Sequence, residues 1–350
     1  MEIEIKPFVE RYSEQCADLL QYLWKEDSAG RLERFKWAYL QNPNTKDAVT
    51  AVIAVNENDE VLGFRGYHTL SVYFGNQERR VAYIADTVVS PNARRQGILQ
   101  KMTSYSFQFL LNNGIYCISN LGPSWPPYHG YKKLDFVDLH EFTSRYKIYA
   151  IRLVISKLFK CKVNSFNDKV LEKRGNVTYF LSRSVPDDTI LSQINDFKKK
   201  GIIMPCRNLD VLKWKAYHPN TKYVFAYALD ENNVLKSFLW FKTYGNGVYN
   251  LGLYQHDDKK IFRRCYKLFN SICAPIIVAA WDWAITEQSK KSLNELHFYK
   301  IPFLNRLRKN PPAIVRTLVV SDNGLKWDLD GIDIRRACNW IVDKIEGDSF

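Results

Sequence analysis

The stretch I-A-D-T-V-V-S-P-N-A-R-R-Q-G-I-L, residues 84–99, decides how the N-terminal part of this chain folds. Its apolar first half predicts a strand that ends at a Ser-Pro-Asn turn, and a helix is expected over residues 94–112. A Gly-containing loop between a strand and a helix N-terminus presents free backbone N–H groups and the positive helix end. Gly97 allows the main chain to approach a phosphate group closely. The stretch therefore predicts an anion-binding loop, with a spacing that fits neither a P-loop nor a dinucleotide fingerprint.

Two further segments follow in order, and together with the loop they resemble the Gcn5-related N-acetyltransferase (GNAT) superfamily. Residues 114–120, G-I-Y-C-I-S-N, predict a short strand that ends in Asn, and residues 124–136, S-W-P-P-Y-H-G-Y-K-K-L-D-F, predict a helix. The loop is similar to the family's acyl-CoA pyrophosphate loop, Arg/Gln-x-x-Gly-x-Gly/Ala, with Leu99 in place of the final small residue. The last segment resembles the closing Tyr-x-x-x-Gly-Phe motif, with Tyr131 at the family tyrosine and Asp135 where Gly is usual.

This resemblance implies that an acyl-CoA, either acetyl-CoA or 3-hydroxybutanoyl-CoA, is a co-substrate and that no metal is needed. The loop amides are expected to hold the diphosphate, and the amides of the preceding strand are expected to bond pantetheine and polarise the thioester. The residues expected to contact acyl-CoA are Val88, Val89, Ser90, Arg94, Arg95, Gln96, Gly97, Ile98, Leu99 and Asn120.

Acyl transfer to an amine needs a base for the amine and an acid for the leaving thiolate. The resemblance assigns the acid role to Tyr131, with core packing as the alternative. Asp86 interrupts an apolar strand, so its carboxylate must be paired or functional. His129 lies in the closing motif, and histidine is the residue type most often used as a general base. We keep both as candidate bases beside a water relay, and a more distant option is His68.

Aromatic side chains and one histidine are the candidates for contacting the acceptor. Trp125 and Tyr128 lie in a stiff segment with two prolines, where they can stack on a ring or fill space between domains. Trp281 ends an apolar strand of the second half. The expected acceptor contacts are Trp125, Tyr128, His68 and Trp281.

An internal repeat indicates a duplicated domain. F-K-W-A-Y-L-Q-N-P-N-T-K, residues 35–46, recurs one residue shorter as L-K-W-K-A-Y-H-P-N-T-K, residues 212–222. Each copy is followed by two strands joined by an Asn/Asp turn, which predicts a hairpin. We therefore expect a mixed α/β fold, largely antiparallel, with two tandem GNAT-like domains over residues 1–150 and 151–350. The second lacks the Arg-x-x-Gly loop and is expected to be structural or to shape the acceptor site.

The composition fits this interpretation. A chain of 350 residues with 46% hydrophobic residues can bury two cores. The net charge of +13 comes mostly from scattered basic doublets, and it favours anionic ligands without choosing among them. No recognised nucleic-acid-binding module is present, and nucleic acid is not expected as a partner. Seven scattered cysteines without a C-x-x-C pair indicate reduced thiols in a cytoplasm, and make zinc binding improbable. No signal peptide or membrane-spanning segment is expected.

Within the GNAT superfamily, the chain is similar to tandem enzymes that acylate nucleotide-linked amino sugars. The resemblance implies transfer to a dTDP-3-amino-3,6-dideoxyhexose in bacterial surface polysaccharide biosynthesis, such as that of lipopolysaccharide O-antigen. One alternative is a Fem-like transferase that takes an aminoacyl group from tRNA, which would account for the positive charge. Another is a non-catalytic acyl-CoA-binding protein. The sequence predicts no particular oligomeric state.

Overall fold

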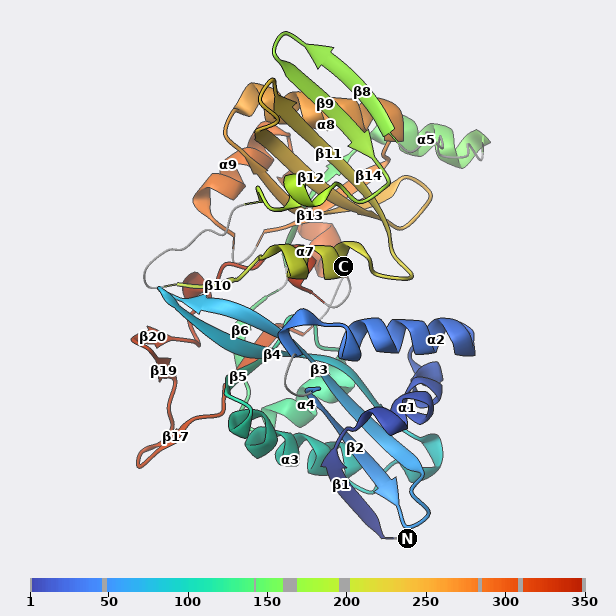
Figure 1. Ribbon diagram of the computed structural model, residues 1–350, viewed down its shortest axis with the longest axis vertical. Coiled ribbons are helices and arrows are strands. Elements are labelled where there is room, and N and C mark those ends of the chain that lie inside the picture. Colours follow the sequence, from blue (N-terminus) through green and yellow to red (C-terminus); the bar gives the residue numbers. More distant parts are fainter. Residues whose placement is uncertain are drawn as a thin grey trace.

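The protein is built around two large mixed sheets, which lie one above the other along the long axis of the molecule (Figure 1). The computed structural model describes residues 2–45, 49–141, 143–159, 169–194, 202–282, 285–307 and 311–347. Each sheet has eight strands and a single parallel pair, and the other neighbours are antiparallel. The expectation of a mixed, largely antiparallel α/β fold is confirmed.

The first sheet contains the strands that follow the first copy of the repeat. Its order is β1 (Ile3–Pro7), β2 (Ala51–Asn56), β3 (Val61–Phe74), β4 (Gln77–Val89), β5 (Ile115–Asn120), β16 (Ala313–Thr317) and β6 (Val137–His140), and β10 (Ile203–Pro205) also pairs with β3. The parallel pair is β4 with β5.

The second sheet repeats this arrangement. Its order is β15 (Tyr299–Lys300), β7 (Ser144–Ile148), β14 (Ile277–Trp281), β13 (Val248–His256), β12 (Leu235–Thr243), β11 (Lys222–Asp230), β9 (Val177–Ser182) and β8 (Lys169–Arg174). The parallel pair is β13 with β14. Two short hairpins, β17 (Val320–Ser321) with β18 (Gly324–Leu325) and β19 (Asp328–Leu329) with β20 (Ile332–Asp333), lie outside both sheets.

Helices cover both faces of the first sheet. Alternate residues of β2 belong to different cores, because successive strand side chains point to opposite faces: Ile53 packs with helix α1 (Ser13–Leu19), and Val52 packs with α3 (Ile98–Asn112). The remaining helices of this half are α2 (Ser28–Phe35) and α4 (Trp125–Lys132). Buried α3 side chains recur at a helical spacing, Ile98, Met102, Ser106 and Leu110.

The second sheet is covered in the same way. Even-numbered residues of β11 such as Val224 face α8 (Lys259–Cys273), and odd-numbered ones such as Phe225 face α7 (Leu209–Ala216). The other helices are α5 (Ala150–Phe159), α6 (Asp188–Leu191), α9 (Glu287–Glu295) and α10 (Pro302–Leu307). No helix in the described ranges is long and apolar enough to cross a membrane.

Strands are exchanged between the two halves of the chain. The sequence pattern predicts one long strand over residues 136–147. The structure has two strands there, because the chain leaves the first sheet after β6 and enters the second sheet as β7. In return, β16 from the C-terminal part inserts between β5 and β6 of the first sheet. The two halves of the chain are therefore tied together by backbone pairing within each sheet.

The sequence pattern predicts a helix over residues 333–346, and this prediction is wrong, because the C-terminal segment forms no α-helix in its described part. It contains short turns of 3₁₀ helix at Ala337–Asn339 and Lys344–Glu346. Asp333 accepts a hydrogen bond from the Arg335 amide at 3.0 Å, and the Trp340 indole donates to the Ile334 carbonyl at 2.8 Å. Burial of Trp340 against the first core determines this path more strongly than helix propensity does.

The two copies of the repeat meet at the boundary between the sheets. Trp37 follows α2 and Trp214 lies in α7, and their rings stack with centroids 4.9 Å apart. Each indole N–H donates to the backbone carbonyl of the other tryptophan at 2.8 Å. This reciprocal pair is what a twofold arrangement of duplicated segments produces, and it makes both tryptophans packing anchors.

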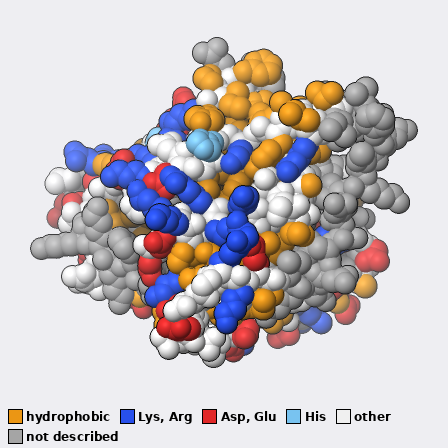
Figure 2. All heavy atoms as spheres, turned by 90° about the horizontal axis from the view of Figure 1, so that it is seen from above, with side chains coloured by type: hydrophobic (Ala, Val, Ile, Leu, Met, Phe, Trp, Pro, Cys, Tyr) orange, Lys and Arg blue, Asp and Glu red, His pale blue; other side chains and the backbone are white. Residues whose placement is uncertain are grey.

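Basic side chains are spread over the surface. Figure 2 views the end of the molecule formed by the second sheet, and Lys and Arg side chains gather in the middle of that face. The net charge of +13 is therefore presented to solvent, where it attracts anionic molecules at a distance.

Candidate active site

The strands β4 and β5 are paired over only part of their length. Their parallel pairing runs from Arg80 with Ile115 to Tyr83 with Ser119. Beyond Tyr83, β4 has a strand partner only on its β3 side within the described ranges. The backbone of residues 84–89 therefore has an edge that no neighbouring strand uses, and a ligand can hydrogen-bond to it.

A bulge in β4 sets the direction of Asp86. The register with β3 shifts between Arg65, which faces Thr87, and Tyr67, which faces Ile84. β4 thus has one more residue than β3 at this point, and such a bulge re-aims the side chains of the bulged strand. Gly66 lies opposite the bulge, and a Cβ atom there would overlap the Tyr39 hydroxyl. A glycine is required at residue 66 so that Tyr39 can reach β4.

The N-terminus of α3 has no side-chain cap. Its N-cap residue Gly97 has a φ of +73°, which glycine adopts without strain, and it makes no capping hydrogen bond through a side chain. Arg95 is also left-handed, with a φ of +65°. Arg94 Nε donates to the Val89 carbonyl at 3.2 Å, which ties the loop to the end of β4. The first amides of α3 are therefore available to an external anion beside the unpaired edge of β4.

The other loop residues divide into exposed and buried positions. Arg94, Arg95 and Gln96 are exposed, whereas Ile98 packs in a small core and Leu99 is half-buried. The Ser90 amide already donates to the Leu62 carbonyl at 2.8 Å, so only the side chain of Ser90 remains for a ligand. Val88 is buried against the first core, and a ligand can reach it only through its backbone.

Asp86 is held by two aromatic side chains. The Trp24 indole donates to its Oδ1 at 2.9 Å, and the Tyr39 hydroxyl donates to its Oδ2 at 2.7 Å. Burial raises the pKa of the Asp86 carboxyl, although these two hydrogen bonds and the Arg34 charge oppose that shift. A fixed carboxylate with a raised pKa is suited to accept a proton near neutral pH.

Tyr131 lies in the core beside a buried arginine. Its side chain is 2% exposed, and its hydroxyl accepts a hydrogen bond from Arg65 Nη1 at 3.1 Å. The same Nη1 atom donates to Thr87 Oγ1 at 3.1 Å, and Arg65 Nε donates to the Tyr67 hydroxyl at 2.6 Å. Arg65 is completely buried, and its Nη2 atom has no hydrogen-bond partner among the described residues. A buried cation of this kind stabilises any negative charge that forms on Tyr131.

Tyr131 and His129 lie on different sides of α4. Tyr131 points into the core, whereas His129 is exposed and stacks on the Trp125 ring with centroids 5.9 Å apart. Trp125 is 46% exposed, and Tyr128 donates a hydrogen bond to Asp138 at 2.9 Å. Trp125, Tyr128 and His129 thus form an outer aromatic cluster. The helix separates His129 from the Tyr131 hydroxyl, because residues two apart on a helix face nearly opposite directions.

His68 and Trp281 both lie at the boundary between the sheets. His68 is enclosed by Tyr39, Trp37 and Trp214, with ring centroids 5.6 to 6.2 Å away. Burial lowers the pKa of His68 well below its usual value, so the ring is neutral. Trp281 packs in the first core beneath the Lys344 amino group, whose Nζ lies 5.0 Å from the ring centroid.

Asn120 stabilises the end of β5. Its Oδ1 accepts a hydrogen bond from the Gly122 amide at 2.9 Å, and its backbone pairs with Ile314 of β16. Within the described residues there is no group of three or more His, Cys, Asp or Glu side chains that could hold a metal ion.

Comparison with known proteins identifies the first half. Residues 4–137 match the sequence model of a family described as "Acetyltransferase (GNAT) domain". Residues 4–137 are therefore similar to a GNAT acetyltransferase domain. The protein is accordingly an acyltransferase, and acyl-CoA is the donor that the GNAT fold binds. A search of curated proteins finds no match.

Solved structures share the fold over most of the chain. A probable N-acyltransferase from Enterococcus faecalis V583 has a TM-score of 0.61 at 11% identity, with 91% of this chain and 73% of that chain covered. A GCN5-related N-acetyltransferase from Anabaena variabilis has a TM-score of 0.59 at 11% identity, with 91% and 73% covered. Saccharomyces cerevisiae N-myristoyltransferase, solved with myristoyl-CoA, has a TM-score of 0.53 at 11% identity, with 98% and 85% covered. Both halves of the chain therefore belong to one GNAT-like arrangement.

One departure from the GNAT pattern has a structural explanation. Asp135 stands where the closing motif usually has Gly, and its φ is +60°. Asp is among the few residues that tolerate the left-handed conformation. The turn after α4 therefore keeps the backbone shape that glycine would give.

Four residues of the candidate site were not predicted from the sequence: Trp24, Tyr39, Arg65 and Thr87. Their partners lie far away in the chain, and Tyr39 is 47 residues from Asp86. A signal was present for Arg65, because an arginine in an otherwise apolar strand needs a buried partner or a functional role.

Proposed function

We propose that the protein transfers an acyl group from acyl-CoA to the amine of a nucleotide-linked amino sugar. A dTDP-3-amino-3,6-dideoxyhexose is the proposed acceptor, and acetyl-CoA or 3-hydroxybutanoyl-CoA the donor, in bacterial surface polysaccharide biosynthesis. The observation that carries the proposal is the uncapped N-terminus of α3 beside the unpaired edge of β4 and the Asp86 carboxylate.

The loop and the strand hold the donor. The amides of residues 95–99 bind the diphosphate, since the Arg94 amide donates to the Pro91 carbonyl, and the Arg94 and Arg95 side chains add positive charge at its rim. The edge of β4 between Ile84 and Val89 bonds pantetheine and stabilises the developing oxyanion with backbone N–H groups.

Asp86 and Tyr131 handle the two protons of the reaction. Asp86 accepts the proton of the attacking amine as the new C–N bond forms. When the C–S bond breaks, Tyr131 donates its hydroxyl proton to the sulfur, and Arg65 stabilises the phenolate that remains. The bridging position of Arg65 between Tyr131 and Thr87 of β4 supports this assignment. Asp86 is preferred to His129 as the base because His129 faces solvent on the other side of α4.

The reaction is proposed to take place in the cytoplasm. All six cysteines in the described part of the chain are thiols, and five of them are buried. This is the state expected of a protein in a reducing compartment.

Measurement of thiol release tests the proposal. Acetyl-CoA and 3-hydroxybutanoyl-CoA are each combined with dTDP-amino sugars, and aminoglycosides and polyamines serve as control amines. We expect kcat/KM to be highest for a dTDP-3-amino-3,6-dideoxyhexose. Acyl-CoA binding without turnover on any amine would instead indicate a non-catalytic binding protein. Transfer from aminoacyl-tRNA would indicate the Fem-like alternative.

A further inference from the structure

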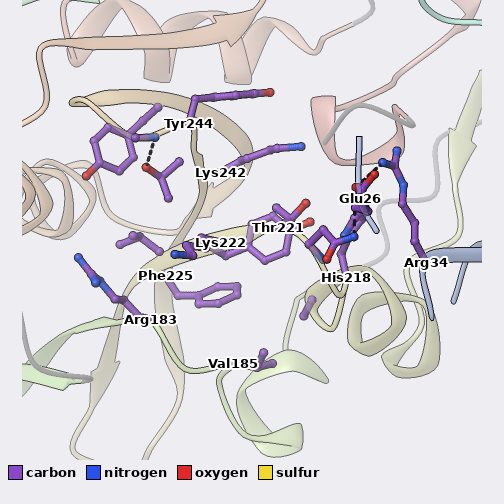
Figure 3. A pocket seen from close by; sticks show the side chains of 17 residues that line it. Glu26, Arg34, Arg183, Val185, His218, Thr221, Lys222, Phe225, Lys242 and Tyr244 are labelled. Carbon is purple, nitrogen blue, oxygen red and sulfur yellow. Dashed lines mark hydrogen bonds and ion pairs between the residues drawn. The ribbon is translucent and has the colours of Figure 1, made fainter. Parts of the chain in front are cut away.

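A large cavity lies beside the boundary between the two halves, separate from the α3 loop. Its volume is about 930 Å³, which is the size of a small-molecule site. Arg34 of α2 and the nearby Glu26 line it from the first half of the chain, and the remaining wall comes from the second half (Figure 3). The walls include the start of β11 and the turn that joins β12 to β13.

The cavity is strongly basic. Its lining contains Arg34, Arg183, Lys222 and Lys242 against a single carboxylate, Glu26. That carboxylate is already engaged, because Arg34 Nη1 lies 2.9 Å from Glu26 Oε1 and the Asn220 amide donates to the same oxygen at 3.1 Å. Figure 3 shows the side chains of this lining and the bonds that hold Glu26. The net charge of the lining is therefore positive.

A buried histidine, His218, also lines the wall of the cavity. Burial lowers the pKa of His218 to about 3, and the charges of Arg34, Lys242 and Lys215 add to this effect. His218 therefore stays neutral at every physiological pH, and contributes no charge to the cavity. A concave site with several cations and an engaged carboxylate favours a multiply charged anion such as a diphosphate.

The Trp24 side chain contacts both Arg34 of the cavity wall and Asp86, the proposed base. The Arg34 guanidinium lies 4.2 Å from the centroid of the Trp24 ring, and the Trp24 indole donates to Asp86 at 2.9 Å. The ring centroids of His218 and Trp37 lie 4.1 Å apart, and the Trp37 ring also packs against the ring of His68. A molecule anchored in the cavity therefore lies next to the residues that surround Asp86.

We propose that this cavity binds the diphosphate of the nucleotide-linked acceptor. The inference rests on the proposed function, and it assigns the phosphate site to the second half of the chain. Lys222 and Lys242 contact the phosphate oxygens from β11 and β12, and Arg34 contacts them from α2. Tyr244 is half-exposed in the lining and offers an aromatic face to the nucleobase. The donor and acceptor diphosphates then occupy different sites, one in each half.

Binding of dTDP in the absence of acyl-CoA tests this assignment. Calorimetry with the full-length protein is expected to detect dTDP, with an affinity that falls as salt increases. The test variant is Lys222→Glu, because Lys222 is exposed and its replacement leaves the core intact. We expect the dTDP Kd to rise by about tenfold or more, while the acetyl-CoA Kd changes by less than about twofold.

The matched control is Lys267→Glu, which makes the same charge change at an exposed position of α8 outside the cavity. This control is expected to change the dTDP Kd by less than about twofold. Absence of dTDP binding, or equal dTDP affinity in Lys222→Glu and the wild type, would overturn the assignment. A loss of acetyl-CoA affinity in Lys222→Glu would also overturn it, because the cavity would then hold the donor. If dTDP binds in the cavity and no dTDP-amino sugar is acylated, the proposed function fails and the nucleotide site stands.

Discussion

The helices α3 and α8 follow equivalent strands in the two sheets, but their N-termini differ. Asp258 caps α8, since its side chain accepts hydrogen bonds from the amides of Lys260 at 2.6 Å and Ile261 at 3.0 Å. Residues 257 and 258 are all that separates β13 from α8, whereas an eight-residue loop that ends at Gly97 precedes α3. The N-terminus of α8 is therefore capped by a carboxylate of the chain itself, whereas the N-terminus of α3 is available to an anion from solution. The two halves share a fold, and the loop before the helix distinguishes the proposed donor-binding half.

The repeat itself shows a second difference of the same kind. The first copy has one extra residue, and the structure accommodates it as a π-helical turn over Lys36–Leu40, in which the Gln41 amide bonds the Lys36 carbonyl. This turn directs Tyr39 to Asp86. The second copy remains an α-helix, and Tyr217 after it is 62% exposed. Single-residue insertions that form π-turns are frequent at functional sites, and this one brings Tyr39 to the proposed base.

The largest effect is expected from giving α3 the cap that α8 has. Gly97→Asp places a carboxylate against the first amides of the helix, and Asp can adopt the left-handed conformation there. We expect acetyl-CoA affinity to fall by at least about 100-fold in calorimetry, with the melting temperature preserved. Gly97→Asn, which is uncharged, is the matched control and is expected to have an intermediate effect. Retained micromolar affinity in Gly97→Asp would refute the role of the loop.

Removal of the proposed base should give the next largest effect. We expect Asp86→Asn to lower kcat by about 100- to 10,000-fold with little change in acetyl-CoA affinity. Because burial raises the pKa of Asp86, the acidic limb of the kcat profile should lie above the usual aspartate range, with activity lost as pH falls. The pH profile of kcat for Asp86→Asn should lack this acidic limb. If the acidic limb is unchanged in the variant, a group other than Asp86 causes it.

Replacement of the proposed acid should have a smaller effect. Tyr131→Phe is expected to lower kcat by about 10- to 1,000-fold with KM little changed, because only proton donation to the thiolate is lost. Tyr128→Phe on the same helix is the matched control, since its hydroxyl bonds Asp138 on the outer side. No decrease of kcat in Tyr131→Phe would remove Tyr131 from the mechanism.

The smallest effect compares the tyrosines of the two repeats. Tyr39→Phe removes one of the two hydrogen bonds that hold Asp86, and we expect kcat to fall by about tenfold. Tyr217→Phe, at the exposed tyrosine that follows the helix of the second copy, is expected to leave kcat unchanged. Steady-state thiol release measures both variants. Equal effects would mean that the π-turn plays no part in positioning Asp86.

The features that were predicted best from the sequence are those determined by local sequence patterns. The sequence pattern predicts a strand over residues 61–74 and a helix near residues 258–271, and the structure has β3 (Val61–Phe74) and α8 (Lys259–Cys273) there. The turn at Gly97 and the duplication are also present. The features that were not predicted from the sequence depend on contacts between residues far apart in the chain. The choice between Asp86 and His129 required knowing that Trp24 and Tyr39 bond Asp86. No local pattern could divide residues 136–147 between two sheets, because β16 competes for β6 from far along the chain.

A crystal structure with bound acetyl-CoA is the decisive test of the proposed donor site. The diphosphate is expected to accept hydrogen bonds from the backbone amides of residues 95–99, and the N-terminus of α8 is expected to remain capped by Asp258. A diphosphate bound at α8, in the basic cavity of the second half, or anywhere else away from the α3 loop would contradict it.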